Sequence, residues 1–272
     1  MGIDTEDIVK LSLELVNWEC LPADSNIHVK GDNIRKVLIA IDASITELIL
    51  AKSLDCDAVI AHHPLGISSL DFHKVFDRHV DYMVENGIPL DQATETTRKL
   101  KERVRLRSHA NIYDQIVHAA KIMNMPLVNI HQPCDEVMRR KILEKITSGS
   151  TEHVSDIIKS IESIGEFKNV KTRVETVFGS SNNRVGRWAL VVAAGTNGGY
   201  PIAKLYFQHG IDTVIYLHID YNDILKIQEE QLRGNLVIMG HLAGDSIGLN
   251  GLADKLEEKG IATVRLGIIP SI

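Results

Sequence analysis

The sequence predicts an α/β protein with mainly parallel sheets, and three observations lead to that class. Short apolar runs alternate along the chain with longer amphipathic segments, as strands buried on both faces alternate with the helices that cover them. Hydrophobic residues make up 44% of the 272 residues, enough for one large domain or two smaller ones. Polar residues with metal-ligand chemistry follow several apolar runs, at the edge where open parallel sheets bind ligands.

Seven apolar runs are predicted as strands because they are short, rich in Val, Ile, Leu and Ala, and bounded by polar or glycine-containing segments. They cover residues 37–41, 58–61, 127–130, 189–193, 213–217, 236–239 and 262–266. Between them, three segments carry apolar residues at three- and four-residue spacing, as helices packed on a sheet do. These predicted helices are residues 46–54, 201–209 and 249–259.

Two α/β domains are expected, residues 1–146 and 147–272, with termini that can pack across the boundary. The stretch 72–125 is rich in charged helix formers and almost free of strand-like runs, so it is predicted as a helical insertion of two or three helices. Residues 144–186 are polar and weakly patterned, and the domain boundary is therefore placed there.

Composition limits the partners and the location of the protein. The 36 acidic and 30 basic residues are spread along the chain without a basic block, so nucleic acid is not an expected partner. Apolar stretches fall well short of the roughly 20 residues that cross a bilayer, so no membrane association is expected. Cys20, Cys56 and Cys134 show no Cys-x-x-Cys spacing and no signal peptide precedes them, which favours a reducing, cytoplasmic location.

His62-His63-Pro64 follows a predicted strand and is the sharpest local motif. Neighbouring side chains at a strand end diverge, so the two imidazoles can address two metal positions of one cavity. Both histidines could instead be ordinary polar loop residues. Asp42 follows the preceding strand in the same way, although Asp is also common there as a turn residue.

Two further motifs place an imidazole and a carboxylate four residues apart. His241 and Asp245 follow a strand and open a helix, and such a pair suits zinc, manganese or iron. Asp245 could instead merely complement the positive helix N-terminus. His131 and Asp135 repeat the spacing, and the two oxygens of Asp135 could bridge two ions. Cys134 between them is read as a small buried residue rather than a ligand.

A glycine-rich loop containing Gly195, Gly198 and Gly199 lies between a predicted strand and a predicted helix. Its backbone N–H groups could bind a phosphate, although the loop matches neither the Walker A sequence nor Gly-x-Gly-x-x-Gly. A tight strand-to-helix turn would need glycines in any case. Histidines without a strand-end context are predicted to be surface or packing residues: His73, His79, His109, His118 and His153.

Taken together, the motifs resemble those of the NGG-one-interacting-factor-three-like family, also labelled GTP cyclohydrolase I type 2 homologues, over nearly the whole length. Asp42 and the segment Asp57-Ala-Val-Ile-Ala-His-His-Pro-Leu65 resemble the strand, spacer and double-histidine motif of that family. His131-Gln-Pro-Cys-Asp135 resembles its His-Thr-x-x-Asp motif. His241 with Asp245 resembles its closing His-x-x-x-Glu.

The resemblance implies a dinuclear site between two α/β domains, at the strand ends. Its ligands would be His62, His63, Asp135, His241 and Asp245, with Asp135 as the bridge between two divalent ions of zinc, manganese or iron. The resemblance also implies a toroidal homohexamer with its metal sites facing an inner cavity.

The cyclohydrolase label implies a metal-dependent hydrolase that acts on GTP or a related nucleotide, with phosphates on the glycine loop. His131 would be a proton-transfer group or an oriented neighbour of the ligands. A metal-binding adaptor or regulatory protein without catalysis is the alternative from another class. The simplest alternative is an α/β protein whose strand-end histidines bind nothing.

The chain departs from the family pattern in three places. Gln132 replaces Thr, Asp245 replaces the final Glu, and Tyr216-Leu217-His218 replaces Thr-Gly-Glu. Asp245 reaches one methylene less far than Glu, so the geometry or the preferred ion can differ. His218 is predicted as an additional ligand or a substrate contact.

Overall fold

The structure is a computed structural model that describes residues 2–192 and 198–271, and its chain divides into two compact units. The first unit comprises Met1–Val75, Val104–Met138 and Asp245–Pro270, and the second comprises Phe76–Arg103, Arg139–Gly244 and Ser271–Ile272. The domains expected from the sequence meet at one boundary near residue 146, whereas the chain passes between the two units at several points. The middle of the helical stretch joins the second unit, and the C-terminal segment returns to the first sheet.

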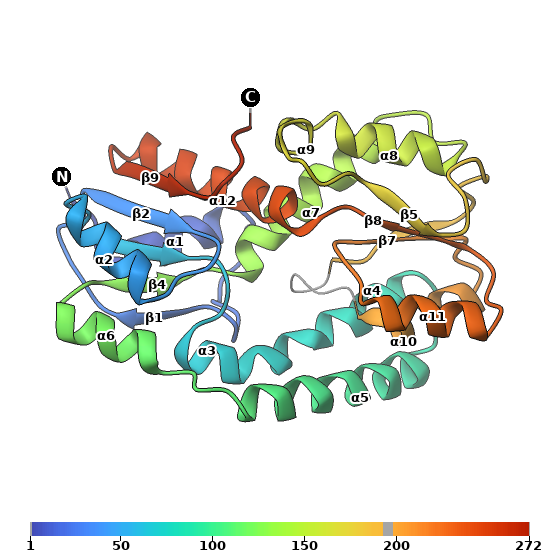
Figure 1. The fold of residues 1–272 in the computed structure, drawn as a ribbon, viewed down its shortest axis with the longest axis horizontal. Coiled ribbons are helices and arrows are strands. Elements are labelled where there is room, and N and C mark those ends of the chain that lie inside the picture. The colour runs from blue at the N-terminus through green and yellow to red at the C-terminus, as the bar shows by residue number, and fades with distance from the viewer. Residues whose placement is uncertain (1, 193–197, 272) are drawn as a thin grey trace. The chain divides into compact units, whose positions relative to one another are not determined.

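The first unit is built on a five-stranded sheet in the order β1-β4-β3-β2-β9 (Figure 1). The strands are β1 Asn26–Val29, β2 Lys36–Ala40, β3 Ala58–Ala61, β4 Leu127–Asn129 and β9 Ala262–Leu266. β2 pairs in parallel with β3 and β9, and β3 pairs in parallel with β4, whereas the edge strand β1 runs antiparallel to β4. The carboxyl ends of β2, β3 and β4 therefore meet at one edge.

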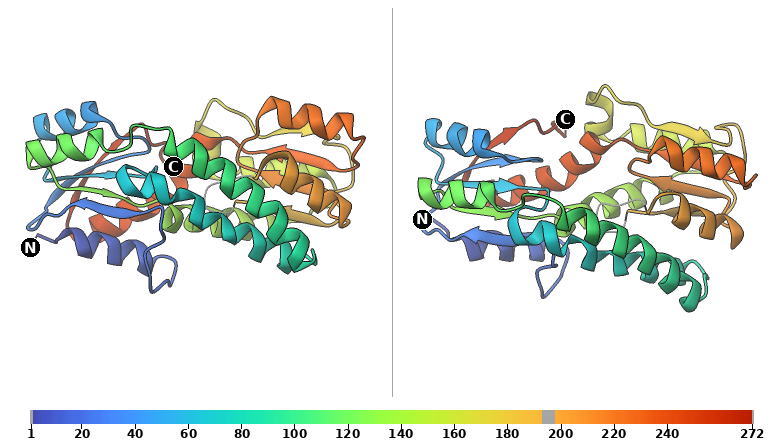
Figure 2. Two further views of the ribbon diagram at one scale, coloured as in Figure 1. Left: turned by 90° about the horizontal axis from the view of Figure 1, so that it is seen from below. Right: turned by 60° about the horizontal axis from the view of Figure 1, so that its bottom comes forward.

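Alternate side chains of this sheet enter two different cores. Val37 and Ile39 pack with α1 (Thr5–Glu14) and the unit-1 part of α12 (His241–Glu258), whereas Leu38 packs on the other face with α2 (Ile45–Ser53) and α6 (Gln115–Met123). Figure 2 shows α1 and α2 on opposite sides of the sheet. Both faces are covered by helices, which explains why these strands read as continuous apolar runs.

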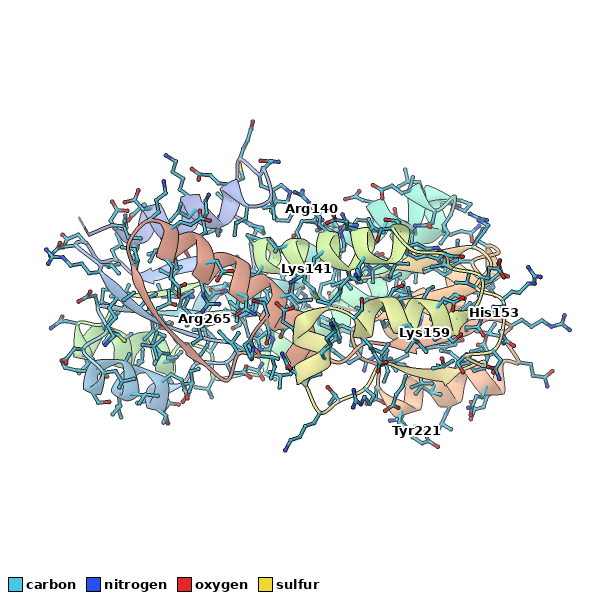
Figure 3. The ribbon with its side chains drawn as sticks, turned by 90° about the horizontal axis from the view of Figure 1, so that it is seen from above. Arg140, Lys141, His153, Lys159, Tyr221 and Arg265 are labelled. Atoms are coloured by element: carbon cyan, nitrogen blue, oxygen red, sulfur yellow. The ribbon has the colours of Figure 1, made fainter. Side chains whose placement is uncertain are left out.

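Two capping boxes and one ion-pair cluster define the helices around this sheet. The side chain of Asp4 accepts a hydrogen bond at the start of α1, and Ser44 does the same at the start of α2. Arg265 on β9, labelled in Figure 3, lies 2.6 Å from Asp254 and 3.0 Å from Glu257 of α12. The last strand is thereby tied to the helix that precedes it. The first unit also contains α3 (Gly66–Asp71) and most of the 3-10 helix η1 (Phe72–Asp77).

The second unit is built on a four-stranded sheet in the order β5-β8-β7-β6. The strands are β5 Glu175–Phe178, β6 Trp188–Leu190, β7 Thr213–Tyr216 and β8 Asn235–Ile238. One edge strand, β5, runs antiparallel to its neighbour β8, whereas β8, β7 and the other edge strand β6 are parallel to one another. The helices that complete the chain are α4 Arg78–Glu85, α5 Leu90–His109, α7 Gln132–Thr147, α8 Val154–Glu162, α9 Gly165–Asn169, α10 Gly199–Gln208 and α11 Tyr221–Glu229.

Helices cover both faces of the second sheet as well. Apolar side chains of α4, α5, α10 and α11 form one core with β6, β7 and β8. Figure 1 shows α8 and α9 on the opposite side of the sheet. Glu166 of α9 is fully buried, and its carboxylate lies 3.2 Å from Nζ of Lys141 on α7, which Figure 3 labels.

The predicted α/β class with two mainly parallel sheets is confirmed. Each of the seven predicted strands exists within a few residues of its expected bounds, and the stretch 72–125 is helical as expected. Across the described parts of the chain, none of the helices combines the length and apolar character that a bilayer crossing requires.

Acid is expected to destabilise the second unit through His79, which is fully buried on α4 beside Phe76. Burial lowers the pKa of His79 from 6.5 to about 3. As the pH falls below 6.5, the unfolded chain binds this proton first, so stability declines progressively between about pH 6.5 and pH 3. The loss from this group reaches about 2 kcal/mol at pH 5.

Urea unfolding at pH 7 and pH 5 tests this prediction. The variant His79→Leu should lose less stability between the two pH values than the wild type, by up to about 2 kcal/mol. His118→Leu, which changes an exposed histidine, is the control and should keep the wild-type pH dependence. Equal pH dependence of the wild type and His79→Leu would show that His79 is not responsible.

Candidate metal centre

Three parallel strands deliver histidine and aspartate side chains to one edge of the first sheet. Backbone hydrogen bonds continue past the strand ends: His62 donates to Ala40 at 2.9 Å, His63 donates to Ile41 at 3.0 Å, and Ile130 donates to Ala61 at 2.9 Å. The residues that follow the three strands therefore remain side by side. This placement agrees with the strand-end positions expected from the sequence.

Each of the three imidazoles at this edge is held at its Nδ1 atom by an oxygen of the protein. Nδ1 of His62 lies 3.1 Å from the carbonyl oxygen of Ile130, and Nδ1 of His63 lies 2.7 Å from Oδ1 of Asp42. Nδ1 of His131 lies 2.7 Å from Oδ2 of Asp24. Such acceptors fix the ring orientation and the tautomer of metal-binding histidines.

Two carboxylates join the imidazoles from the helices α7 and α12. Asp135 lies in the first turn of α7, and Asp245 lies in the second turn of α12. The helices approach closely at Gly248, where an added Cβ would lie 2.2 Å from the carbonyl oxygen of Cys134. The absence of a side chain at Gly248 therefore lets the two carboxylates approach His62.

The side chains of His62, Asp135 and Asp245 form a buried acidic group. They are 0%, 3% and 2% exposed, and one ligand atom of each lies within 4.8 Å of the others. Nε2 of His62 is 3.3 Å from Oδ1 of Asp135 and 3.8 Å from Oδ1 of Asp245. A second group, His62, His63 and His131, also places one ring nitrogen of each residue within 4.8 Å of the others.

Three buried polar atoms of this centre have no well-aligned hydrogen-bond partner among the described residues, although two of them, Nε2 of His62 and Oδ1 of Asp135, lie 3.3 Å apart as an ion pair. The three atoms are Nε2 of His62 and both carboxylate oxygens of Asp135. Buried charged groups are normally paired or bound to a metal, because desolvation makes them costly otherwise. Imidazole nitrogens and carboxylate oxygens are suitable ligands for zinc, manganese or iron. The side chains therefore fit a divalent metal ion.

The electrostatic field of the centre attracts a cation. Burial lowers the pKa of the His62 imidazole, but the carboxylates of Asp245 and Asp135 outweigh burial and raise that pKa well above its ordinary value. A proton on His62 therefore neutralises part of the acidic charge when no ion is bound. A metal ion would compete for the same position with that proton.

Cys134 is a small buried residue, as expected from the sequence. It is 1% exposed and belongs to the apolar core beneath the sheet. Burial raises the pKa of its thiol, which disfavours the thiolate that a metal requires.

The second unit holds two other sequence-predicted residues, His241 and His218. His241 is exposed and begins α12, one turn before Asp245 on the same helix. His218 follows β7 and is also exposed, and its ring centroid lies 4.8 Å from that of His241. The two imidazoles are therefore neighbours within this unit.

The glycine loop is described only in part, because Gly195 lies outside the described residues. Gly198 and Gly199 have φ angles of +75° and +61°, a left-handed backbone that favours glycine. A Cβ on Gly199 would also lie 2.5 Å from Oδ2 of Asp223. Backbone geometry thus favours glycine at both positions, independently of any ligand.

Asp24 is the principal residue of the centre that sequence analysis missed. It lies in an irregular segment before β1, without a motif or a strand end to mark it, and 107 residues separate it from His131. Its full burial is the signal that identifies it, and burial cannot be read from the sequence of a loop.

The family model Duf34/NIF3 (NGG1p interacting factor 3) matches residues 26–271. A NIF3 superfamily protein from Sphaerobacter thermophilus is 38% identical, with a TM-score of 0.94 over 98% of this chain and 99% of the other. A search of curated proteins found no match.

Two more distant solved structures share the fold. Reduced HcgD from Methanocaldococcus jannaschii is 12% identical, with a TM-score of 0.61 over 98% of each chain. Protein SA1388 from Staphylococcus aureus is 16% identical, with a TM-score of 0.54 over 97% of each chain. The family match covers most of the chain, and the chain belongs to the Duf34/NIF3 (NGG1p interacting factor 3) family.

Proposed function

We propose that the protein is a metal-dependent hydrolase with two divalent ions per chain, acting on a nucleotide or a related small molecule. The observation that carries this proposal is the buried group of His62, Asp135 and Asp245. Its two carboxylates are costly to bury unless a positive charge lies beside them, and a metal ion would supply that charge. A purely structural role would not require such a group to lie at the strand ends, where α/β proteins bind ligands.

The proposed ligands are His62, His63, Asp135, His241 and Asp245, with Asp135 between the two ions. When bound, the ions would lower the pKa of a water molecule and polarise the group that it attacks. Asp42 orients His63 through the 2.7 Å contact at Nδ1. His131 is proposed to hold a proton beside the ligands, since its Nδ1 lies 3.5 Å from Oδ2 of Asp135 and 2.7 Å from Oδ2 of Asp24.

The substrate proposal follows the cyclohydrolase label of the family and concerns GTP or a related nucleotide. Gly195, Gly198 and Gly199 are proposed to offer backbone N–H groups to its phosphates. Of these, Gly198 and Gly199 lie at the start of α10. Hydrolysis should be measured with GTP, other nucleotides and simple phosphate esters, after the protein is loaded with zinc, manganese or iron.

The matched variants for this assay are His63→Ala and Asp114→Asn. His63→Ala removes a proposed ligand, and turnover should fall by at least about 100-fold in a folded protein. Asp114→Asn breaks an exposed Asp114–His118 pair of the first unit and should leave turnover unchanged. Absence of turnover in metal-loaded wild-type protein across all these substrates would contradict the hydrolase proposal.

His218 is proposed as an additional ligand or a substrate contact because its ring lies beside that of His241. In His218→Ala, the substrate concentration at half-maximal rate should rise, or one bound ion should be lost, while the fold stays intact. Steady-state kinetics and elemental analysis of the same preparation measure both effects. Unchanged kinetics together with unchanged metal content would remove His218 from the site.

A metal-binding adaptor is the second candidate function, and an apolar surface of the first unit favours it. Ile112 and Ile122 are 88% and 82% exposed, and they line a cavity of about 630 Å³ with Ile45 and Tyr113. Exposed apolar patches of this kind mark interaction surfaces. The same surface is compatible with the proposed homohexamer, which light scattering of the purified protein would reveal as the mass of six chains.

A further inference from the structure

Asp24 is a fully buried carboxylate in contact with His131. Its side chain is 0% exposed, and Oδ2 accepts a hydrogen bond of 2.7 Å from Nδ1 of His131. The partner is nearly as well shielded, since the His131 side chain is 5% exposed. A hydrogen bond to an ionised carboxylate in such surroundings is among the strongest that a neutral ring can make.

Buried hydrogen bonds fix the backbone of Asp24 and its neighbour Ser25 beside His131. The backbone N–H of His131 donates to Oγ of Ser25 at 2.8 Å, and Nδ2 of Asn129 donates to the carbonyl oxygen of Asp24 at 2.7 Å. Asn129 is itself oriented by Ser68, whose hydroxyl donates to Oδ1 at 2.8 Å. The other carboxylate oxygen, Oδ1, accepts a hydrogen bond of 3.4 Å from the hydroxyl of Ser25, so each oxygen of the Asp24 side chain has a polar partner.

The chemistry of the pair decides where His131 carries its proton. An ionised carboxylate only accepts hydrogen bonds, so Nδ1 of a neutral His131 must carry the hydrogen and the lone pair must lie on Nε2. His62 and His63 are held at Nδ1 by protein oxygens in the same way. All three rings of the cluster are thus prepared to offer Nε2.

We propose that Asp24 is the positioning residue of His131, which it keeps in the Nδ1–H form so that Nε2 is the ring nitrogen available to an ion or its water. The binding of an ion or its water by Nε2 rests on the proposed function, whereas the Nδ1–H tautomer of His131 does not. Asp24 acts through His131 and is assigned no contact with substrate.

The ring form can be measured without metal, by ¹⁵N–¹H correlation spectra of metal-free, histidine-labelled full-length protein at pH 8. His131→Gln assigns the His131 signals by their loss. The wild type should show His131 with hydrogen on Nδ1 and an unprotonated Nε2. Hydrogen on Nε2, whether alone or on both nitrogens, would overturn the proposal.

Asp24→Asn then tests the cause, because an asparagine amide can present its NH₂ group to Nδ1 of His131. The Nε2–H form should appear in this variant. The matched control is Asp42→Asn, which changes a carboxylate at the same 2.7 Å distance from His63 and should leave the His131 signals unchanged. An unaltered His131 spectrum in folded Asp24→Asn would overturn the positioning role.

Zinc affinity, measured by competition with a chelator, separates this inference from the proposed function. If Nε2 of His131 binds the ion itself, in addition to the proposed ligands, Asp24→Asn should bind zinc roughly 10- to 100-fold more weakly than the wild type, since Asp24 is then the carboxylate behind a metal-binding histidine. Wild-type zinc affinity in Asp24→Asn would overturn the use of the lone pair at an ion. A wild type that binds no zinc but shows the Nδ1–H form would contradict the proposed function and leave the role of Asp24 intact.

Discussion

Replacing Asp135 with asparagine is expected to abolish metal binding and, at the same time, to stabilise the metal-free protein. Asp135 and Asp245 are both nearly inaccessible to solvent, and each has a carboxylate oxygen close to His62. Only part of their combined charge is neutralised by a proton on His62. Asparagine has nearly the volume of aspartate but no charge, so it removes the repulsion between the two neighbouring carboxylates while Asp245 remains beside His62. The free energy of unfolding of the metal-free protein should therefore rise, by about 1 kcal/mol.

The metal affinity of Asp135→Asn should fall by more than about 100-fold, because the loss of a direct ligand exceeds the usual effect of losing an outer neighbour. Urea unfolding in the presence of a chelator measures the first effect, and titration with zinc measures the second. Asp114→Asn, at an exposed Asp–His pair, should change neither quantity noticeably. Tight zinc binding by Asp135→Asn would remove this residue from the centre.

Gly248→Ala is expected to destabilise the protein and to weaken the metal centre together. An alanine Cβ at this helical position would lie 2.2 Å from the carbonyl oxygen of Cys134 and 2.6 Å from its carbonyl carbon. These are backbone atoms, so α7 and α12 must move apart. The cost should be about 3 kcal/mol, more than the roughly 1 kcal/mol that alanine gains over glycine in a helix.

Gly251→Ala provides the matched control on the same helix. An added Cβ there would lie 3.2 Å from the side-chain atom Cγ1 of Val137, which can shift by a few tenths of an ångström. Its stability should remain within about 1 kcal/mol of the wild type, since helix propensity offsets the contact. Thermal unfolding and zinc titration of both variants measure the difference. Equal stability of the two variants would show that the close approach at Gly248 is unimportant.

The parallel strands were predictable because each is buried on both faces and reads as an apolar run. Val37, Leu38 and Ile39 are all fully buried although they alternate between two cores. The antiparallel edge strands β1 and β5 escaped prediction for the converse reason. Their residues are half-buried or exposed and include polar side chains, so neither strand reads as an apolar run. The polar–apolar alternation of β1 extends over only four residues, and β5 does not alternate.

The candidate site was predictable to the extent that strand order places it. His62, His63 and His131 follow parallel neighbours, so their sequence positions imply proximity. Asp24 and its hydrogen bonds depend on the path of a loop, and no local pattern in the sequence encodes that path. The sequence analysis allowed the termini to pack across the domain boundary, but it did not indicate the partner of β9, which pairs with β2 across more than 200 residues.

The most direct test of the account is the metal content of the purified full-length protein, measured by elemental analysis after separate reconstitution with zinc, manganese and iron. About two equivalents per chain are predicted for the wild type, with loss of bound metal in folded His63→Ala and in folded Asp135→Asn. A folded wild-type protein that retains none of the three metals would contradict the central claim that the buried histidine and aspartate residues form a metal centre.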